Sequence, residues 1–497
     1  MVTGYLDNFY ARLGIPRSAT KQEVRSAYHE AARKFHPDTN KDPGAMEVFL
    51  QIQEAFETLS HAEKRAAYDE RLPEDIDTPE DILVSAIYSR EVLPIIDSPQ
   101  LVYVLLNLVA VPDLKNGSEL TSPPLNICLV LDTSTSMSGR RLEAVQETAI
   151  TIVQSLKPQD ILSAVTFSDR AEVIIPATRG QNMSMIEARI SIIHTSGGTE
   201  IGQGLQTGLN EITHNLNPGY HNNLILVTDG RTYGDEENCL EMADNAAKNG
   251  ITISCLGIGN KWNDEFLDTL AGKTGGSSAF AATPNTIKEF LKAKFGQIQN
   301  TFANNIILNY TTPPNVELRY AFRLSPEAGS LKLNTNLPMG DIPLGKSLSV
   351  LMEFMVEAIP EEAKDLTLTV GDLQLTIPSL PIPNTSSKLS LSRVVAKNPK
   401  TEPPPQVLVK AMSRLSLYRM QELAKRDLDE GNIEQATQRL KNLATQLLSS
   451  GQADLAHTVM IEMDAIERTK NLSEAAQKRI KYGTRALVSH FFEEPDL

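Results

Sequence analysis

Apolar residues recur at every third or fourth position through residues 1–72, and this spacing predicts a small helical domain. Thr20 and Glu23 form a capping box, so one helix begins just after Thr20. Pro37 cannot continue that helix, because proline lacks the amide hydrogen that the helix needs. The tripeptide His36-Pro37-Asp38 is therefore expected at an exposed turn, with another helix after it.

Between residues 122 and 298, short apolar runs alternate with helical patterns. The runs at 125–131 and 224–227 are rich in Ile, Val and Leu, which is typical of strands buried on both faces. Helical spacing follows them, for example at 142–155 and 238–248. This alternation predicts an α/β domain with a doubly wound, mostly parallel sheet.

Two apolar segments before this domain and five after it follow strand patterns. They are 83–87 and 101–111 before it, and 305–311, 316–322, 329–333, 347–357 and 366–375 after it. Turn residues such as Asn336-Leu337-Pro338 separate the later segments. Since two strands alone cannot bury both faces, we predict one β-sandwich, formed by residues 83–115 and 300–380, into which the α/β domain is inserted.

Two further segments have the composition of linkers. Residues 73–82 are acidic and contain proline, and we expect them only to keep their neighbours apart. Residues 382–405, which include Pro403-Pro404-Pro405, are interpreted as a second linker. From 406 to 491 the apolar residues return to helical spacing, so the chain is predicted to end in a bundle of antiparallel helices.

The charge and the cysteines narrow the classes of function. A formal net charge of −15 argues against nucleic-acid binding, which requires basic residues, and against docking on anionic membranes. The three cysteines lie far apart and form no CxxC pair, which favours a reducing compartment. The longest apolar run, 101–111, is too short to span a bilayer, and the N-terminus lacks the features of a signal peptide. We therefore expect a cytoplasmic protein.

Candidate metal ligands follow the apolar run at 125–131. Asp132, Ser134 and Ser136 stand at the carboxyl end of this predicted strand, where open α/β sheets place their ligand sites. One carboxylate and two hydroxyls form an all-oxygen cluster that suits a hard cation such as Mg²⁺. The same residues also fit a turn rich in Ser and Thr that caps the next helix.

Two later segments favour the metal site. Thr199 stands in the glycine-rich stretch 196–200, and Asp229 follows the second buried run. In this order the three parts resemble the metal-ion-dependent adhesion site of the von Willebrand factor A family, over about residues 125–297. The resemblance implies Mg²⁺, or Mn²⁺ or Ca²⁺ in its place. The implied direct ligands are Ser134 and Ser136, and the implied direct or water-mediated ligands are Asp132, Thr199 and Asp229.

The N-terminal domain resembles another family. Residues 8–15 before the His36-Pro37-Asp38 turn and residues 63–69 after it complete a pattern similar to the J-domain of DnaJ-type co-chaperones. That resemblance implies a domain that brings a DnaK-type chaperone to a client and stimulates its ATPase. The residues implied to contact the chaperone are His36, Pro37 and Asp38, with Arg25, Arg33 and Lys34 on the preceding helix.

Together these patterns predict a multidomain fold: an all-α J-domain, a doubly wound α/β von Willebrand factor A domain inserted in a β-sandwich, and a C-terminal α-helical bundle. No GxSxG, HExxH or P-loop pattern occurs, so we expect no enzyme. The expected function is that of a co-chaperone adaptor whose metal site holds a protein partner or client through an acidic residue. The alternatives are a structural or assembly subunit of a metal-dependent complex, in which the J-domain mainly tethers, and a metal-dependent hydrolase. For the metal site itself, the alternative is a cation that only holds three loops together.

Overall fold

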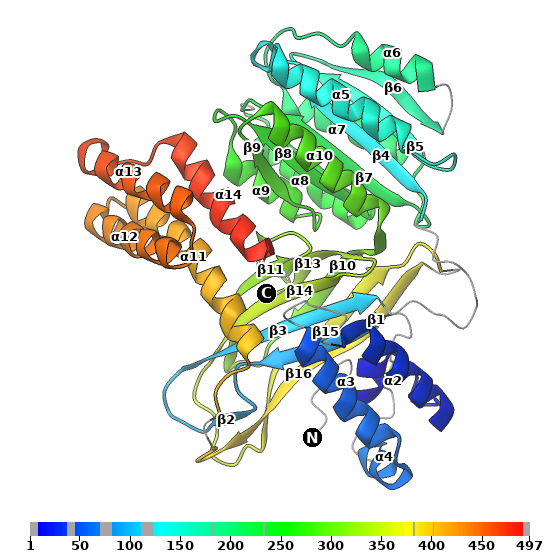
Figure 1. Cartoon of the computed structure of the whole chain (residues 1–497), viewed down its shortest axis with the longest axis vertical. Helices are drawn as coiled ribbons and strands as arrows, with labels where there is room; N and C mark the ends of the chain where they lie inside the picture. Colours follow the sequence, from blue (N-terminus) through cyan, green and yellow to red (C-terminus); the bar gives the residue numbers. More distant parts are fainter. Residues whose placement is uncertain are drawn as a thin grey trace.

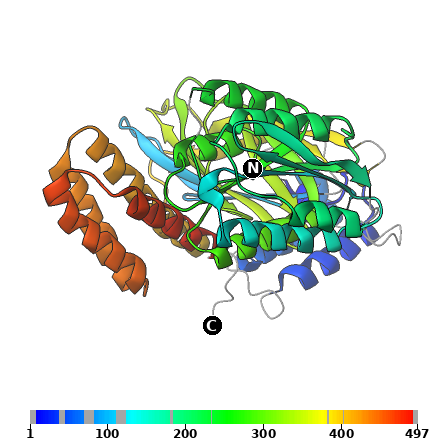
Figure 2. The ribbon, with the colours of Figure 1, turned by 90° about the horizontal axis from the view of Figure 1, so that it is seen from above.

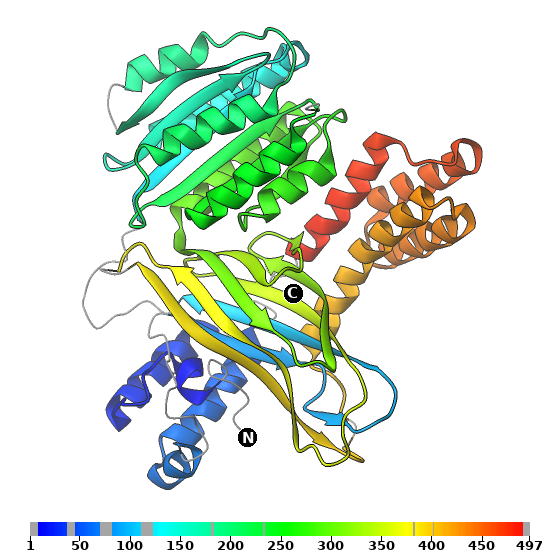
Figure 3. The same cartoon turned by 180° about the vertical axis from the view of Figure 1, so that it is seen from behind.

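The computed structural model places four folded units in one assembly (Figure 1). It describes residues 8–36, 45–69, 82–110, 123–179, 183–231, 234–380, 383–400 and 402–490. The β-sandwich lies in the middle, with the α/β domain at one end and the N-terminal helices at the other (Figure 3). Seen from above, the C-terminal helices project to one side of the α/β domain (Figure 2).

The N-terminal unit consists of short helices around one apolar core. The helices are α1 (Phe9–Leu13), α2 (Lys21–Phe35), α3 (Ala45–Leu59) and α4 (Ala62–Asp69). The predicted capping box is confirmed, because the Glu23 amide donates to the Thr20 hydroxyl and the Thr20 amide donates to the Glu23 carboxylate. The core of this unit extends into the sandwich, since Leu83 and Val109 are buried with Tyr10 and its neighbours. The two units are thus packed against each other, and the predicted linker 73–82 lies outside the described part except for Ile82.

The sandwich consists of two five-stranded sheets. The first has the order β1 (Ile82–Tyr88), β3 (Gln100–Ala110), β14 (Ser347–Val356), β11 (Val316–Ser325) and β12 (Gly329–Ser330). The second has the order β13 (Asn336–Pro343), β10 (Thr301–Thr311), β15 (Asp365–Thr376), β16 (Asn384–Ala396) and β2 (Val92–Pro94). Strand β3 pairs with β14 from Gln100–Val356 to Val109–Ser347, so the two halves on either side of the α/β domain form one sheet.

Two strands of the sandwich were predicted incorrectly. Strand β13 begins at Asn336, where we predicted a turn, and it contains Pro338 and Pro343. It lies at the edge of its sheet, where a proline without an amide hydrogen is tolerated. Strand β16 covers most of the segment interpreted as the linker 382–405. Its buried residues Leu389 and Leu391 alternate with more exposed ones, a weak strand pattern that the flanking prolines obscured.

The inserted domain has the predicted doubly wound sheet. Its strands are β4 (Leu125–Asp132), β5 (Ile161–Phe167), β6 (Ala171–Arg179), β7 (His221–Thr228), β8 (Ile251–Ile258) and β9 (Ser278–Ala281), in the order β6-β5-β4-β7-β8-β9. All pairs are parallel except β5 with the edge strand β6. Helices α5 (Arg140–Gln154), α6 (Met183–Ser191) and α10 (Pro284–Gln299) cover one face. Helices α7 (Ile201–Thr213), α8 (Glu236–Lys248) and α9 (Asp264–Gly272) cover the other.

The C-terminal helices form a domain that rests on both of its neighbours. They are α11 (Gln406–Asp429), α12 (Ile433–Ser449), α13 (Ala453–Thr469) and α14 (Glu474–His490). Gly431 and Gly451 follow α11 and α12 with positive φ angles of 82° and 78°, as expected for glycines that end helices. The first half of α11 packs on the sandwich, where Leu408 and Leu415 share a core with Leu105 of β3. Within the described ranges, no helix has the combination of length and apolar character that crossing a bilayer requires.

The placement of β16 gives a stability test. Leu391→Ala should lower the free energy of unfolding by about 2–4 kcal/mol, because it leaves a cavity where a fully buried side chain was. The matched control is Ser386→Ala at an exposed position of the same strand, which should change stability by less than about 0.5 kcal/mol. Urea unfolding followed by circular dichroism measures both. Equal effects of the two substitutions would show that the segment is a linker after all.

Candidate functional site

The candidate metal ligands come together at the carboxyl end of the central strands. Strand β4 ends at Asp132, and its parallel neighbour β7 is followed directly by Asp229. Both side chains are almost completely buried. Two carboxylates from distant parts of the chain thus stand at one edge of the sheet because the two strands pair in parallel register.

Asp132 is held by groups of its own loop and of β7. Its Oδ1 accepts a hydrogen bond from the Ser134 amide at 2.8 Å, and its Oδ2 accepts one from the Thr228 hydroxyl at 2.6 Å. Burial raises the pKa of Asp132 above its ordinary value, and these hydrogen bonds offset part of the rise. Asp132 therefore fixes the loop at Ser134 to the end of β7.

Asp229 gathers the two serines and a basic side chain. The Ser136 hydroxyl donates to Asp229 Oδ1 at 2.6 Å, and the hydroxyl oxygens of Ser134 and Ser136 are 3.1 Å apart. On the other side of the carboxylate, Arg141 Nη1 donates to Asp229 Oδ2 at 2.6 Å. Arg141 was not predicted as a site residue. The available sequence signal was its position in the first turn of α5, five residues after the last serine of the DxSxS segment.

Thr199 reaches the same place from a glycine-rich loop. A Cβ atom added to Gly230, the residue after Asp229, would lie 2.7 Å from the Thr199 hydroxyl oxygen, so Thr199 packs against this glycine. The loop is held by Asp169, whose Oδ1 accepts from the Gly198 amide at 2.7 Å, and by the Ser196 amide, which donates to the Thr133 carbonyl at 2.7 Å. Gly197 has a φ of +69°, a conformation that favours glycine.

The donor set fits a divalent cation. It offers two carboxylates and three hydroxyls, all oxygen ligands of the kind that Mg²⁺ takes. Asp229 already accepts the cationic guanidinium of Arg141, which shows that positive charge is stabilised at this carboxylate. In the described ranges no cluster of three or more His, Cys, Asp or Glu side chains is arranged to hold a metal. A cation at the candidate site would therefore need the serine and threonine hydroxyls as ligands besides the two carboxylates.

The predicted chaperone-contact residues surround the end of α2. His36 directly follows the last residue of α2, and its half-buried ring packs edge-on against Phe49, with ring centroids 5.3 Å apart. Arg25 and Arg33 are exposed on α2. Pro37, Asp38 and the side chain of Lys34 lie outside the described part. His36 is thus less exposed than we expected, because Phe49 of α3 covers one edge of its ring.

A buried ion cluster joins the α/β domain to α14. Asp268 of α9 accepts from Arg485 at 2.8 and 2.9 Å and lies 2.6 Å from Lys481 Nζ, which also contacts Asp264 at 2.6 Å. Burial alone would raise the pKa of Asp268, but the charges of Arg485 and Lys481 outweigh burial and hold it far below its ordinary value. At the start of α14, Glu474 pairs with Arg231, two residues beyond Asp229, at 2.5 Å.

Comparison with known proteins assigns the parts of the chain. Family models match a DnaJ domain at residues 8–69, a von Willebrand factor type A domain at 126–293 and an Sll0103-like C-terminal alpha-helical domain at 406–490. Protein sll0103 of Synechocystis sp., itself described as uncharacterized, is 25% identical over 371 residues, which are 72% of this chain and 87% of the relative.

Two further matches agree with this division. The chaperone protein DnaJ of Streptococcus uberis is 50% identical over 62 residues, which are 12% of this chain and only 16% of that protein. A solved structure, the von Willebrand factor type A protein from Catenulispora acidiphila, superposes with a TM-score of 0.64 at 16% identity, over 81% of this chain and 96% of that one. The chain is therefore a multidomain protein that carries a DnaJ domain at residues 8–69 and a von Willebrand factor type A domain at residues 126–293.

Proposed function

We propose that this protein is a co-chaperone adaptor. Its J-domain recruits a DnaK-type chaperone and stimulates the chaperone's ATPase, and its von Willebrand factor A domain binds a protein partner or client through a Mg²⁺-dependent adhesion site, with Mn²⁺ or Ca²⁺ as alternative ions. The observation that carries the proposal is the convergence of Asp132, Ser134, Ser136, Thr199 and Asp229 at one edge of the sheet, in a chain that also has a J-domain.

The charge of the site supports binding through a carboxylate of the partner. Only Asp132 and Asp229 are anionic, whereas the three hydroxyls are neutral dipoles. Mg²⁺ bound here supplies a coordination position that a partner's Asp or Glu can fill, since five side chains leave part of a six-oxygen shell open. Because the site lies beside low-dielectric buried strands, such an ion contact is stronger than it is in bulk water.

The hydrogen bonds also support a role in binding rather than in catalysis. A hydrolytic mechanism needs a general base to activate water. Asp132 is engaged by Thr228 and the Ser134 amide, and Asp229 by Ser136 and Arg141. The protein's proposed surroundings are the cytoplasm, without nucleic acid or membrane partners, which suits the net charge of −15 and the three buried, unpaired cysteines.

The first test removes one hydroxyl ligand. Ser136→Ala should weaken Mg²⁺ binding to the purified protein by about tenfold or more. The substitution removes one hydroxyl ligand, and losing one contact with a charged group costs at least about 1.4 kcal/mol of binding free energy. Isothermal titration calorimetry measures this affinity, and Ser138→Ala, at an exposed position two residues away, should bind as the parent does.

The same variant separates the adaptor from a purely structural metal. Partners captured from lysate should be lost on addition of EDTA and with Ser136→Ala, while the melting temperature changes little. If EDTA lowers the melting temperature strongly but leaves partner capture unchanged, the cation merely holds the loops together and the adhesion proposal is wrong.

Arg141 provides a second test of the site. Its guanidinium pairs with Asp229. It would repel a divalent cation bound at that carboxylate by about 1–2 kcal/mol, calculated with the dielectric constant of water. Arg141→Gln should therefore raise Mg²⁺ affinity by about tenfold, measured by the same calorimetry at low ionic strength. The matched control Arg140→Gln removes an adjacent exposed charge and should have a much smaller effect. A weaker affinity in Arg141→Gln would show that the arginine supports the metal-binding conformation instead.

The J-domain is tested by the ATPase of a DnaK-type chaperone. His36→Gln should abolish the stimulation, because it alters the tripeptide implied to contact the chaperone. His61→Gln makes the same change at an exposed position between α3 and α4, away from the predicted contact face of α2, and as the matched control it should keep the stimulation. Because the His36 ring packs on Phe49, circular dichroism must show an intact fold, and Asp38→Asn provides a second variant that keeps the side-chain shape. Full stimulation by both variants would refute the co-chaperone role. The assembly-subunit and hydrolase alternatives do not require the protein to stimulate the chaperone's ATPase.

A further inference from the structure

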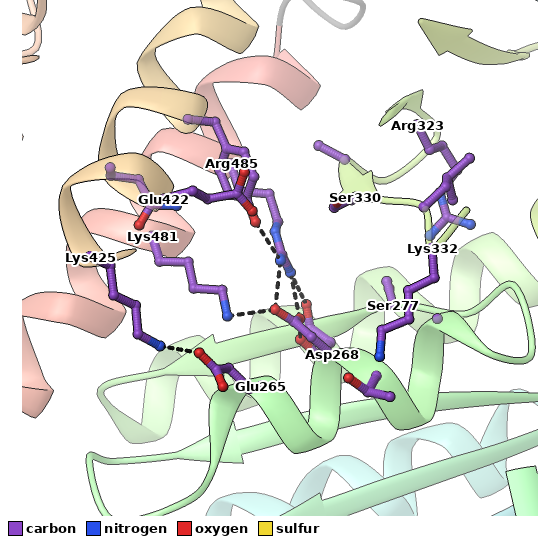
Figure 4. A pocket seen from close by; sticks show the side chains of 18 of the residues that line it. Glu265, Asp268, Ser277, Arg323, Ser330, Lys332, Glu422, Lys425, Lys481 and Arg485 are labelled. Atoms are coloured by element: carbon purple, nitrogen blue, oxygen red, sulfur yellow. Dashed lines mark hydrogen bonds and ion pairs between the residues drawn. The ribbon is translucent and has the colours of Figure 1, made fainter. Parts of the chain in front are cut away.

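A cavity lies where three of the folded units meet. Its volume is about 500 Å³, which is within the range that holds a small organic ligand. Helix α9 and strand β9 of the α/β domain form one wall, the β11–β12 region of the sandwich forms another, and α11 and α14 form the third (Figure 4). Nothing at this junction belongs to the candidate metal site, which lies at the carboxyl ends of β4 and β7.

Basic side chains outnumber acidic ones in the lining of the cavity. Six Arg and Lys side chains line it against four Asp and Glu side chains. Several of these charges cancel: Asp268 pairs with Lys481 and Arg485, and Glu265 pairs with Lys425. Arg426 and Asp429 are both exposed at the end of α11, and because their charges are opposite they add no net charge to the lining.

Two lining cations, Arg323 and Lys332, form no ion pair in the described ranges, although the nearby carboxylates of Glu327 and Asp341 act on the charge of Arg323. Arg323 is buried and donates to four backbone carbonyls, those of Gly275, Gly276, Glu327 and Met339. Lys332 extends from the segment after β12 into the cavity (Figure 4), and it has no ion pair with any side chain in the described ranges. Among the acidic residues that line the cavity, Glu422 has a pKa that burial raises above its ordinary value.

Unsatisfied hydrogen-bond donors point to the same kind of ligand. Gln421 Nε2 and Arg485 Nε are buried, and neither has an acceptor among the described residues. Both residues line the cavity, and both donors belong to side chains that are more than nine-tenths buried. Buried donors without acceptors are rare in folded proteins. A bound group rich in acceptor oxygens, with a small turn of the Gln421 amide, would supply partners for them.

We propose that this cavity binds a small multivalent oxyanion, held between Lys332 on the sandwich side and Arg485 and Gln421 on the helical side. The oxygens come from a phosphate or pyrophosphate group, or from a polycarboxylate, since both offer several charged acceptors in a small volume. Because the anion contacts all three walls, its binding stabilises the junction between the α/β domain, the sandwich and the C-terminal helices.

The experiment uses the full chain after treatment with EDTA and dialysis into metal-free buffer without the chelator, so that neither a bound cation nor the chelator's own carboxylates contribute. Pyrophosphate and citrate are titrated separately by calorimetry against a background of constant ionic strength. Saturable one-to-one binding of either anion is expected, and the tighter of the two identifies the phosphate or the polycarboxylate class. No saturable heat with either anion overturns the proposal.

Substitutions locate the binding. Lys332→Glu should weaken it by about tenfold or more, because it replaces the unpaired cation with an anion, and it should fold normally since Lys332 is exposed. Lys364→Glu makes the same charge change at an exposed sandwich position outside the cavity and should bind as the parent does. Gln421→Met, which keeps the side-chain length but removes the donor, should weaken binding severalfold. Equal losses in Lys332→Glu and Lys364→Glu would mean a general charge effect, and the assigned site would be wrong.

Discussion

The pairing of β3 with β14 is the constraint on which the rest of the structure depends. These strands belong to segments on either side of the inserted domain, yet they pair along their whole length in the middle of one sheet. The J-domain rests on this sheet through Leu83 and Val109, and α11 rests on it through Leu105 and Leu351. Without this pairing neither helical unit would have a surface to pack on, and the ends of the inserted domain would not be held together.

The buried ion cluster at α14 forms a second interface, between the C-terminal helices and the von Willebrand factor A domain. Asp268, Lys481 and Arg485 are desolvated together, so their net contribution to stability is small, while removing one partner would leave an unpaired charge at a cost of about 3–5 kcal/mol. Such a cluster favours one orientation of the two units over others. That orientation also brings Glu474 to Arg231, on the loop that follows Asp229.

The sequence patterns that predicted structure correctly were local. The Thr20 capping box and the apolar strands that end at Asp132 and Asp229 depend on neighbouring residues, and the structure has both. Strands β13 and β16 were missed because the prolines within β13 and those flanking β16 resemble turn and linker signals, and only pairing with β10 and β15 makes them strands. The contact of Arg141 with Asp229 joins residues 88 positions apart, so the place of Arg141 shortly after the DxSxS segment did not indicate its partner. The docking of the J-domain depends on the shape of a tertiary surface, which composition cannot reveal.

The split of the sandwich also affects how the chain is made. During synthesis, β1 and β3 leave the ribosome long before β14 exists, because the whole inserted domain is translated between them. At about 5–20 residues per second, the edge of β3 stays unpaired for tens of seconds. An apolar strand with an open edge is prone to pair with other nascent chains. The DnaJ domain is complete before β3 appears, so on the nascent chain it stands directly before an apolar strand whose partner has not yet been made.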